Sequence, residues 1–126
     1  MRPTLLLSML IAGACGTLAR YLLASAIRSV AGSQFPWGTW GVNLLGCVFF
    51  GWVYALAEHR SSLSDETRLV LLVGFAGAFT TFSTLAFDTV ELARQGRWIA
   101  AAGNLVLQNV LGCAAILLGL WLGKGR

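Results

Sequence analysis

Four long apolar blocks make up most of this chain, and each is long enough to cross a lipid bilayer as a helix. The blocks extend over about residues 4–29, 37–57, 68–93 and 98–122. A helix needs about 20 predominantly apolar residues to cross the roughly 30 Å hydrocarbon core. Only 11% of the 126 residues are charged, whereas an ordinary soluble domain has about 25%. The sequence therefore predicts one all-α integral membrane domain over residues 1–126, with four transmembrane helices.

Neither the basic residues nor the cysteines of the chain indicate a nucleic-acid or metal site. The net charge is +4, and Lys and Arg lie mostly at the edges of the apolar blocks, where cations meet lipid headgroups. No exposed face interleaves them with aromatic side chains, so we expect membrane lipid and no nucleic acid among the partners. The three cysteines lie inside apolar blocks without metal-ligand spacing and are interpreted as small buried hydrophobes: Cys15, Cys47 and Cys113.

Positive charges are almost evenly divided between the two ends that four spans would create. The end with both termini would hold five Lys or Arg, and the other would hold three, or four with Arg20. Since the Lys and Arg bias sets orientation, so small a difference sets it weakly. The pattern favours a chain that inserts both ways up and pairs as an antiparallel dimer; a fixed orientation with a weak bias stays the alternative. Four helices also enclose too little interior for a water-filled route, and glycines in every span favour oligomerisation.

Amide side chains inside two of the blocks are candidates for a polar ion path. Thr39 and Asn43 lie on one face of the second block. Asn43 can donate two hydrogen bonds, so it either serves an ion or ties helices together. In the fourth block, Asn104 and Gln108 lie along one stripe, and Asn109 lies along the adjacent one. Polar groups in a bilayer cost energy unless they are paired, so three amides this close together favour a polar track over simple packing.

The third block contains a segment that makes a poor uninterrupted helix. Residues 74–84 read GFAGAFTTFST, with two glycines and four hydroxyl residues at mid-membrane depth. Gly and β-branched Thr weaken a helix, and Ser and Thr hydroxyls offer the backbone other partners. A break here would free carbonyl oxygens, which can ligate a cation when protein shields them from lipid. Phe75, Phe79 and Phe82 also share a stripe, either as packing or with their positive ring edges towards an anion.

Charged residues inside or near the ends of two blocks complete the candidate set. Arg20 lies deep in the first block, where a centred Arg costs about 2.5–3.5 kcal/mol on insertion scales. We therefore expect Arg20 to reach the interface or the mouth of an aqueous vestibule. Asp88 and Glu91 precede Arg94 and Arg97 at the end of the third block. These spacings favour a partly solvated charged cluster at that end.

Three motifs together resemble one family of membrane channels. The segment 74–84 is similar to the third-helix signature of the Fluc/CrcB fluoride channels. Pro-Trp-Gly-Thr at 36–39 followed by Asn43 resembles that family's second-helix start, and the motif GxxGxxxRY at 13–21 resembles its first helix. The resemblance covers essentially the whole chain in order, with matching length and number of spans.

The resemblance implies a channel that exports cytoplasmic fluoride by passive electrodiffusion across the inner (plasma) membrane of a bacterium-like cell. It implies an antiparallel, dual-topology homodimer with two fluoride pathways and a break in the third helix. A structural sodium ion at the dimer centre would be held by the backbone carbonyls of Gly77 and Thr80 from both chains. By position, the pathway residues are Asn43 and Phe82, with Thr84 and Asn109 as further donors, and Arg20 and Asp88 supply vestibule or interface charge.

The chain departs from the family pattern at three positions of the third block. Leu85 stands where the family has a second phenylalanine, Ala78 replaces a glycine, and Phe79 replaces an aliphatic residue. Leu85 has no ring edge to present to an anion. Either one aromatic residue suffices, or a sister subunit supplies the other, so a non-conducting or heterodimer-only subunit stays an alternative.

Two other function classes fit the sequence less well. A small multidrug transporter also has four spans and dual topology, but it needs a membrane-embedded carboxylate, and the first block contains no Asp or Glu. A membrane enzyme is disfavoured because the only histidine, His59, falls in an expected loop. No Ser or Cys has a base at a plausible spacing either. We therefore expect no catalytic residues.

Overall fold

Four helical spans account for nearly all of the chain. The computed structural model describes residues 2–60 and 63–125. Its elements are α1 (Pro3–Ala31), α2 (Trp37–Arg60), α3 (Asp65–Leu69), η1 (Val70–Ala76), α4 (Gly77–Phe79), α5 (Phe82–Arg94) and α6 (Trp98–Lys124). Elements α3 to α5 together form the third span. All four spans are long and apolar enough to cross a membrane, which confirms the prediction of an all-helical chain with four membrane helices.

Helix α2 is longer than the sequence predicts. The prediction ends this span near residue 57, whereas the structure continues it through Glu58 to Arg60. The expected loop position of His59 is therefore wrong, because its backbone belongs to α2. Glu and Arg are good helix formers, and no Gly or Pro stops the helix before this point. The first and last spans extend only one or two residues beyond their expected bounds.

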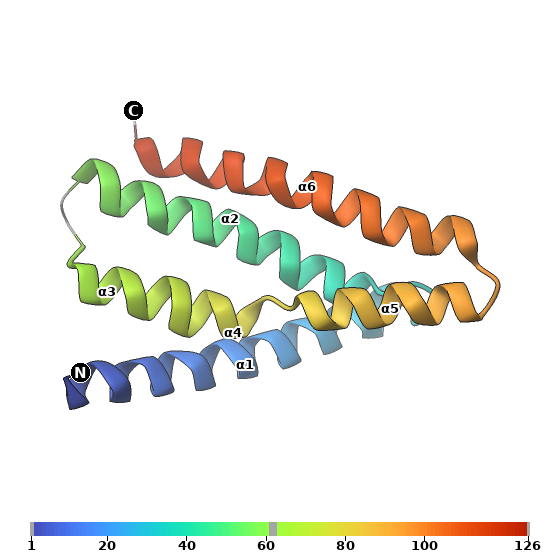
Figure 1. Ribbon diagram of the computed structural model, residues 1–126, viewed down its shortest axis with the longest axis horizontal. Coiled ribbons are helices and arrows are strands. Elements are labelled where there is room, and N and C mark those ends of the chain that lie inside the picture. The colour runs from blue at the N-terminus through green and yellow to red at the C-terminus, as the bar shows by residue number, and fades with distance from the viewer. Residues whose placement is uncertain (1, 61–62, 126) are drawn as a thin grey trace.

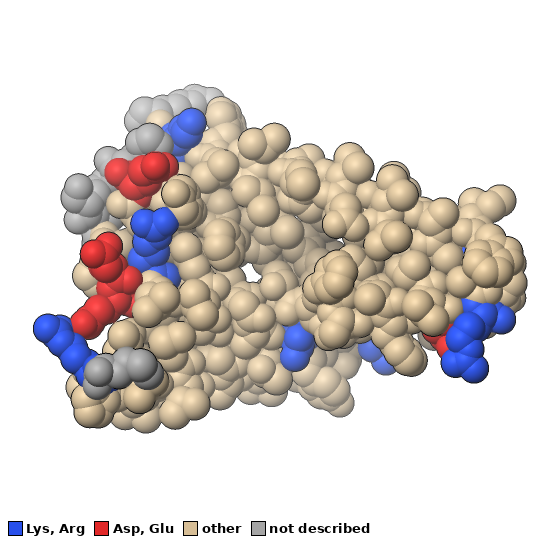
Figure 2. All heavy atoms as spheres, viewed as in Figure 1, with Lys and Arg blue, Asp and Glu red and all other residues tan. Residues whose placement is uncertain are grey.

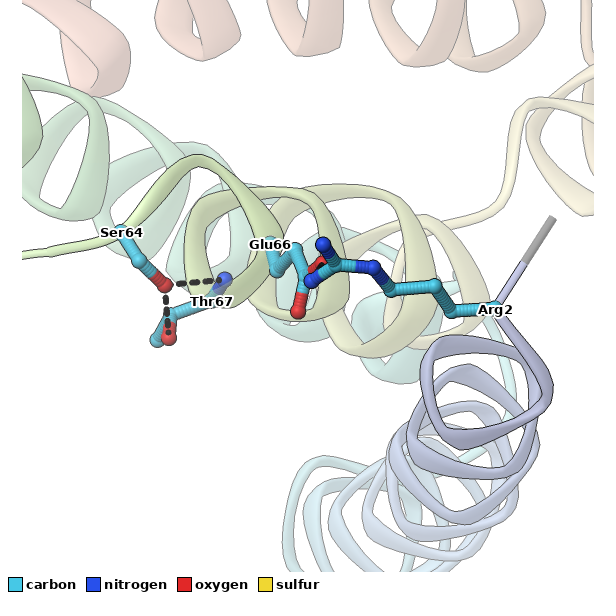
Figure 3. A network of polar contacts seen from close by, with 4 residues as sticks. All are labelled: Arg2, Ser64, Glu66 and Thr67. Carbon is cyan, nitrogen blue, oxygen red and sulfur yellow. Dashed lines mark hydrogen bonds and ion pairs between the residues drawn. The ribbon is translucent and has the colours of Figure 1, made fainter.

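The third span begins with a capped turn beside the start of α1 (Figure 3). Helix α3 starts before residue 68, the expected beginning, and its N-cap is Ser64. Ser64 Oγ accepts the backbone N–H of Thr67 at 3.2 Å and lies 2.9 Å from the Thr67 hydroxyl. Arg2 Nη1 lies 2.9 Å from Glu66 Oε1, so α1 and α3 are linked at this end. Both charged side chains are largely exposed, so the ion pair adds little stability.

The spans alternate in direction and keep most of their charges at the ends. In Figure 1, α1 and the third span run away from the end that carries both termini, and α2 and α6 run back towards it. Helices α2 and α6 are therefore parallel to each other. Figure 2 shows most charged side chains at the two ends of the molecule; the surface between them is largely uncharged, apart from basic side chains along its lower edge. This distribution suits a bilayer, whose core admits few charges while its headgroups accept them.

The most extensive helix packing joins α2 and α6. Glycines make this close approach possible: a Cβ atom at Gly119 would overlap the carbonyl oxygen of Val48, and one at Gly51 would overlap that of Ile116. A Cβ at Gly123 would lie only 2.6 Å from the carbonyl oxygen of Trp52. Small residues let helix backbones approach closely in a membrane, and here they fix the distance between α2 and α6.

The third span changes its backbone conformation twice. Element η1 is a π-helix, and α4 is a single short turn. Thr80 (φ −85°, ψ 159°) and Thr81 (φ −151°, ψ 113°) are extended, and α5 starts at Phe82 with Thr81 as its N-cap. We call these two threonines the extended pair. They lie inside the segment 74–84, whose composition makes a poor uninterrupted helix.

The aromatic stripe expected on the third span does not form. Phe75 and Phe79 stack with ring centroids 5.8 Å apart and an angle of 10° between their planes. Phe79 is buried, whereas Phe82 follows the extended pair and is exposed. The stripe was predicted for a continuous helix, and the extended pair changes the direction in which Phe82 leaves the backbone. The first two rings are therefore packing residues.

Candidate functional site

A groove on the outer surface of the chain gathers most of the predicted pathway residues. It has a volume of about 370 Å³ and lies where α2, α6 and the start of α5 meet. Asn43, Thr80, Phe82 and Asn109 all contribute to its lining. Thr84 does not line this groove. We call this feature the α2–α6 groove.

Asn43 clamps the extended pair from the wall of the groove. Its Oδ1 accepts the backbone N–H of Thr81 at 2.8 Å, and its Nδ2 donates to the Thr81 carbonyl at 3.2 Å. The same Nδ2 donates to Gln108 Oε1 at 2.9 Å. The amide oxygen and both amide hydrogens therefore have partners within the chain. Asn43 acts as a tie between α2, α6 and the third span, and an anion would have to replace one of its present acceptors.

Gln108 belongs to a buried series of amides that fixes Asn43. The Oδ1 atom of Asn104 accepts from Gln108 Nε2 at 2.9 Å and from Trp40 Nε1 at 2.8 Å. Its Nδ2 donates to Thr89 Oγ1 at 2.8 Å. Within residues 2–60 and 63–125, no buried side-chain nitrogen or oxygen lacks a partner. Because every member is paired, the series holds Asn43 in one orientation. The amides at positions 104 and 108 therefore form an internal hydrogen-bonded series.

At the extended pair, two backbone N–H groups bond to side chains and not to the carbonyls that they would reach in an unbroken helix. In an unbroken helix, the Gly77 carbonyl would accept from the Thr81 N–H, and the Thr80 carbonyl from the Thr84 N–H. Here the Thr81 N–H donates to Asn43 Oδ1, and the Thr84 N–H donates to Thr81 Oγ1 at 3.2 Å. These two carbonyls are the ones that the resemblance assigns to a sodium ion. Backbone oxygens of this kind are suitable ligands for a hard cation.

Arg20 points towards the extended pair. Its Nη1 atom lies 3.5 Å from the carbonyl oxygen of Thr80, at the outer limit of a hydrogen bond, and its side chain is half-buried. The sequence favours an Arg20 side chain that reaches the interface or a vestibule mouth. The structure directs it towards Thr80 in the third span, where a carbonyl without its helical donor attracts a cation inside a membrane. Its place at an interface or a vestibule mouth stays a prediction.

Asp88 and Thr84 line a second pocket, which is polar and has a volume of about 340 Å³. Asp88 Oδ2 accepts the hydroxyl of Thr39 at 2.7 Å, which links α5 to α2. Arg28 and Arg97 line the same pocket, so it carries charges of both signs. Thr84 thus lines a different pocket from the other three predicted pathway residues, although it bonds to Thr81 at the edge of the groove. Pairing with Thr39 also gives the Asp88 carboxylate a fixed orientation.

The α2–α6 groove contains two aromatic rings, although position 85 is a leucine. Phe82 is 73% exposed, whereas Leu85 is only 5% exposed. Phe50 of α2 lines the same groove and supplies a second ring. Asn109 also lines it, but its Nδ2 donates to the carbonyl of Leu105 on its own helix at 2.6 Å. The groove is therefore lined by aromatic rings from two helices and by three amides, of which Asn43 and Gln108 bond to each other and Asn109 bonds within its own helix.

Two residues of this site were missed by sequence reasoning. The sequence places Gln108 only within a polar stripe and indicates no role for Phe50. Their roles depend on the parallel packing of α2 and α6, which brings position 108 beside Asn43 and turns position 50 into the groove. The available signal was the spacing of seven residues between Asn43 and Phe50, which is two turns on one helix face.

Comparison with known sequences decides the family. The sequence profile of the family described as "CrcB-like protein, Camphor Resistance (CrcB)" matches residues 7–120. The chain belongs to the CrcB family. The matched residues cover all four spans. The match confirms the family that the motifs of the first three spans resemble.

CrcB relatives named "Fluoride-specific ion channel FluC" match most of this chain. The protein from Nitrosococcus oceani is 47% identical over 114 residues, which is 90% of this chain and 91% of the relative. That from Solidesulfovibrio magneticus is 50% identical over 114 residues, with the same two coverages of 90% and 91%. That from Geobacter sulfurreducens is 42% identical over 120 residues, or 95% and 94%. Family members are channels, so the chain is a multi-pass membrane protein and not an enzyme, as expected.

Proposed function

We propose that this chain forms a fluoride channel through which cytoplasmic fluoride leaves the cell passively across the inner membrane. The α2–α6 groove carries this proposal, because it places the Asn43 amide and the Phe82 ring beside the extended pair in a relative of proteins named as fluoride channels. Fluoride is small and strongly hydrated, so a selective route must supply substitute donors. Amide N–H groups, hydroxyls and positive ring edges do so without a fixed charge that would hold the ion too tightly.

Asn43 is the central donor of this route. Fluoride that reaches its amide takes the place of Gln108 Oε1 or of the Thr81 carbonyl, the two present acceptors of Nδ2. A hydrogen bond to an anion is stronger than one to a neutral oxygen, which compensates for the bond that is exchanged. When the ion leaves, the internal acceptor returns. This exchange lets fluoride bind favourably at Asn43 and also leave quickly, as conduction requires.

The conducting unit is an antiparallel homodimer with two pathways. In a single chain the groove lies on the outer surface, and polar backbone beside it would face lipid unless another protein surface covers it. Large apolar side chains of α1, α5 and α6 are exposed as well, among them Leu10, Phe87 and Val110. The nearly even division of positive charge supports insertion in both orientations. A second, inverted copy would close each groove.

A structural sodium ion at the dimer centre belongs to the same proposal. The carbonyls of Gly77 and Thr80 from both chains would hold it, and their helical donors are directed to side chains instead. An oxygen cage suits a hard cation and would join the two chains electrostatically. Arg20 approaches the Thr80 oxygen, but a carbonyl has two lone pairs and can serve a second partner.

Replacing Phe82 with Ile should slow fluoride flux while the dimer stays intact. Phe82 is exposed in the single chain, so its loss disturbs little packing, but the variant has no ring edge in the groove. An aromatic contact contributes about 0.5–1.5 kcal/mol, so we expect flux to fall by roughly twofold to tenfold. Fluoride efflux from liposomes measures it. Phe87→Ile is the matched control, because Phe87 is similarly exposed on α5 but does not line the groove. Undiminished flux in the first variant would remove Phe82 from the pathway.

Replacing Thr80 with Ala should leave both flux and dimer stability nearly unchanged. The Thr80 hydroxyl donates to the Ala76 carbonyl at 3.0 Å, and that oxygen already accepts the Thr80 N–H at 3.0 Å. The proposed sodium ligand is the backbone carbonyl, which the variant keeps. Sodium dependence of dimer stability in detergent measures the effect. Thr81→Ala is the comparison, since loss of its N-cap bond should cost about 1 kcal/mol. A large loss with Thr80→Ala would assign the role to the hydroxyl.

A heterodimer-only or non-conducting subunit is the alternative that Leu85 keeps open. Phe50 supplies the groove with a second ring, and this observation favours a homodimer that needs no sister subunit. The described lining of the groove contains no Asp or Glu, so it offers no proton-exchanging carboxylate of the kind that a multidrug transporter needs.

A further inference from the structure

Two thiol groups line the α2–α6 groove, one from each helix. Cys47 of α2 is half-buried, Cys113 of α6 is exposed, and both contribute to the lining. The interpretation of the cysteines as buried hydrophobes is therefore wrong for Cys113 in the single chain, and also for the exposed Cys15 of α1. Each groove thiol follows a groove amide by four residues, which is about one helical turn: Cys47 follows Asn43, and Cys113 follows Asn109.

The parallel packing of α2 and α6 brings the two thiols to one level. Trp40 bonds to Asn104 and Asn43 bonds to Gln108, so contacts between these helices join residues 64 or 65 positions apart. The same register continues one turn further on, where a Cβ atom built on Gly112 would lie 3.6 Å from Cys47 Sγ. Cys113 is the next residue along α6. Position 112 has no side chain, and both cysteines line the same groove, so we infer that the two thiols face each other across it.

A pair of thiols without further ligands suits a soft metal ion that binds two ligands. Among residues 2–60 and 63–125, no group of three or more His, Cys, Asp or Glu side chains comes together. Structural zinc takes four such ligands, so it does not match this pair. Thiolate sulfur is a soft ligand. Mercury(II) is a soft cation and forms linear complexes with two thiolates.

We propose that Cys47 and Cys113 of one chain bind a single mercury(II) ion across the groove. With HgCl₂, two Hg–S bonds form and two Hg–Cl bonds break, and two thiol protons leave with two chloride ions. No oxidation state changes. The product has no net charge, so it avoids the cost of a charge within the bilayer. A monovalent soft cation on the same two thiolates would leave one negative charge there. This site exists whether or not the groove conducts fluoride.

Mercury binding by the purified full-length chain tests the site without any flux measurement. HgCl₂ is added in detergent, excess glutathione removes mercury held by one thiol, and native mass spectrometry counts the mercury retained per chain. X-ray absorption then counts the sulfur neighbours of the metal. We expect one mercury per chain with two sulfur neighbours in the unmodified protein and in Cys15→Ser. In Cys47→Ser and in Cys113→Ser, retention should fall at least tenfold, because each keeps only one groove thiol.

Three results would overturn this assignment. The first is no retained mercury in the unmodified chain, and the second is equal retention by Cys47→Ser and the unmodified chain. The third is mercury that joins two chains, which would appear as a complex of two covalently linked chains on a denaturing gel without thiol reagents. Thermal unfolding of each serine variant shows whether the fold is kept. A folded Cys113→Ser variant that has lost the metal, beside a Cys15→Ser variant that retains it, would support the pair.

Discussion

Replacing Asn43 with Leu should remove most fluoride flux and loosen the third span. The variant leaves three groups without their partner: the N–H and carbonyl of Thr81 and the Oε1 of Gln108. An unpaired buried group costs about 1–3 kcal/mol, so we expect a loss of unfolding free energy on the order of 3 kcal/mol. The pathway also loses a donor to an anion, which is worth about 1.5–3 kcal/mol, so flux should fall by about tenfold to hundredfold.

The Gln108→Met variant separates the two effects of Asn43. It keeps the Asn43 amide and removes its partner Oε1, together with one bond to Asn104. We expect a similar loss of stability, because buried partners are again left unpaired. Flux per folded dimer should stay close to that of the unmodified chain, since the anion donor is present. Efflux rates normalised to folded dimer, with thermal unfolding measured in parallel, provide the test. Equal flux losses in both variants would make Asn43 a structural tie alone.

The Gly119→Ala variant should prevent α2 and α6 from packing as they do. The added Cβ would overlap the Val48 carbonyl oxygen and would lie 2.8 Å from the backbone nitrogen of Trp52. Both obstacles are backbone atoms, so no side-chain rotation relieves them. Overpacking costs about 1–3 kcal/mol. Because the groove and the Asn43 clamp depend on this helix pair, we expect a lower Tm together with a loss of flux.

Gly103→Ala is the matched control on the same helix. Among residues 2–60 and 63–125, no atom outside the neighbouring backbone of its own helix lies within 4 Å of a Cβ built on Gly103. Alanine favours a helix over glycine by up to about 1 kcal/mol, so this variant should be neutral or slightly more stable. Thermal unfolding of both variants in one detergent gives the comparison. Equal Tm values would contradict the close packing of α2 and α6 at Gly119.

Features that depend on one helix could be predicted from the sequence. Four spans follow from block length and apolar composition, and the Ser64 cap follows from a cap residue before an acidic first turn. The end of α2 at Arg60 could not be predicted, because charged residues occur both in polar loops and in helix ends that extend beyond a membrane. The unusual composition of segment 74–84 indicated a poor helix, but not which two residues are extended.

Features that depend on the register between helices could not be predicted. Asn43 was recognised as an ion donor or a tie, but its partners Thr81 and Gln108 come from two other spans. The direction of Arg20 depends on a carbonyl whose helical donor is redirected elsewhere. The position of Phe82 was inferred from a continuous helix and is set instead by the extended pair. Each of these outcomes results from tertiary packing that overrides local periodicity.

Fluoride efflux from liposomes that contain only this purified chain tests the proposed function most directly. A fluoride electrode follows the loss of the ion, and a chloride electrode follows a parallel sample. We expect rapid loss of fluoride while chloride is retained, which would establish a self-sufficient fluoride channel that tolerates Leu85. Retention of fluoride by liposomes with properly dimeric protein would contradict this function for the homodimer, and equally rapid loss of chloride would contradict its selectivity.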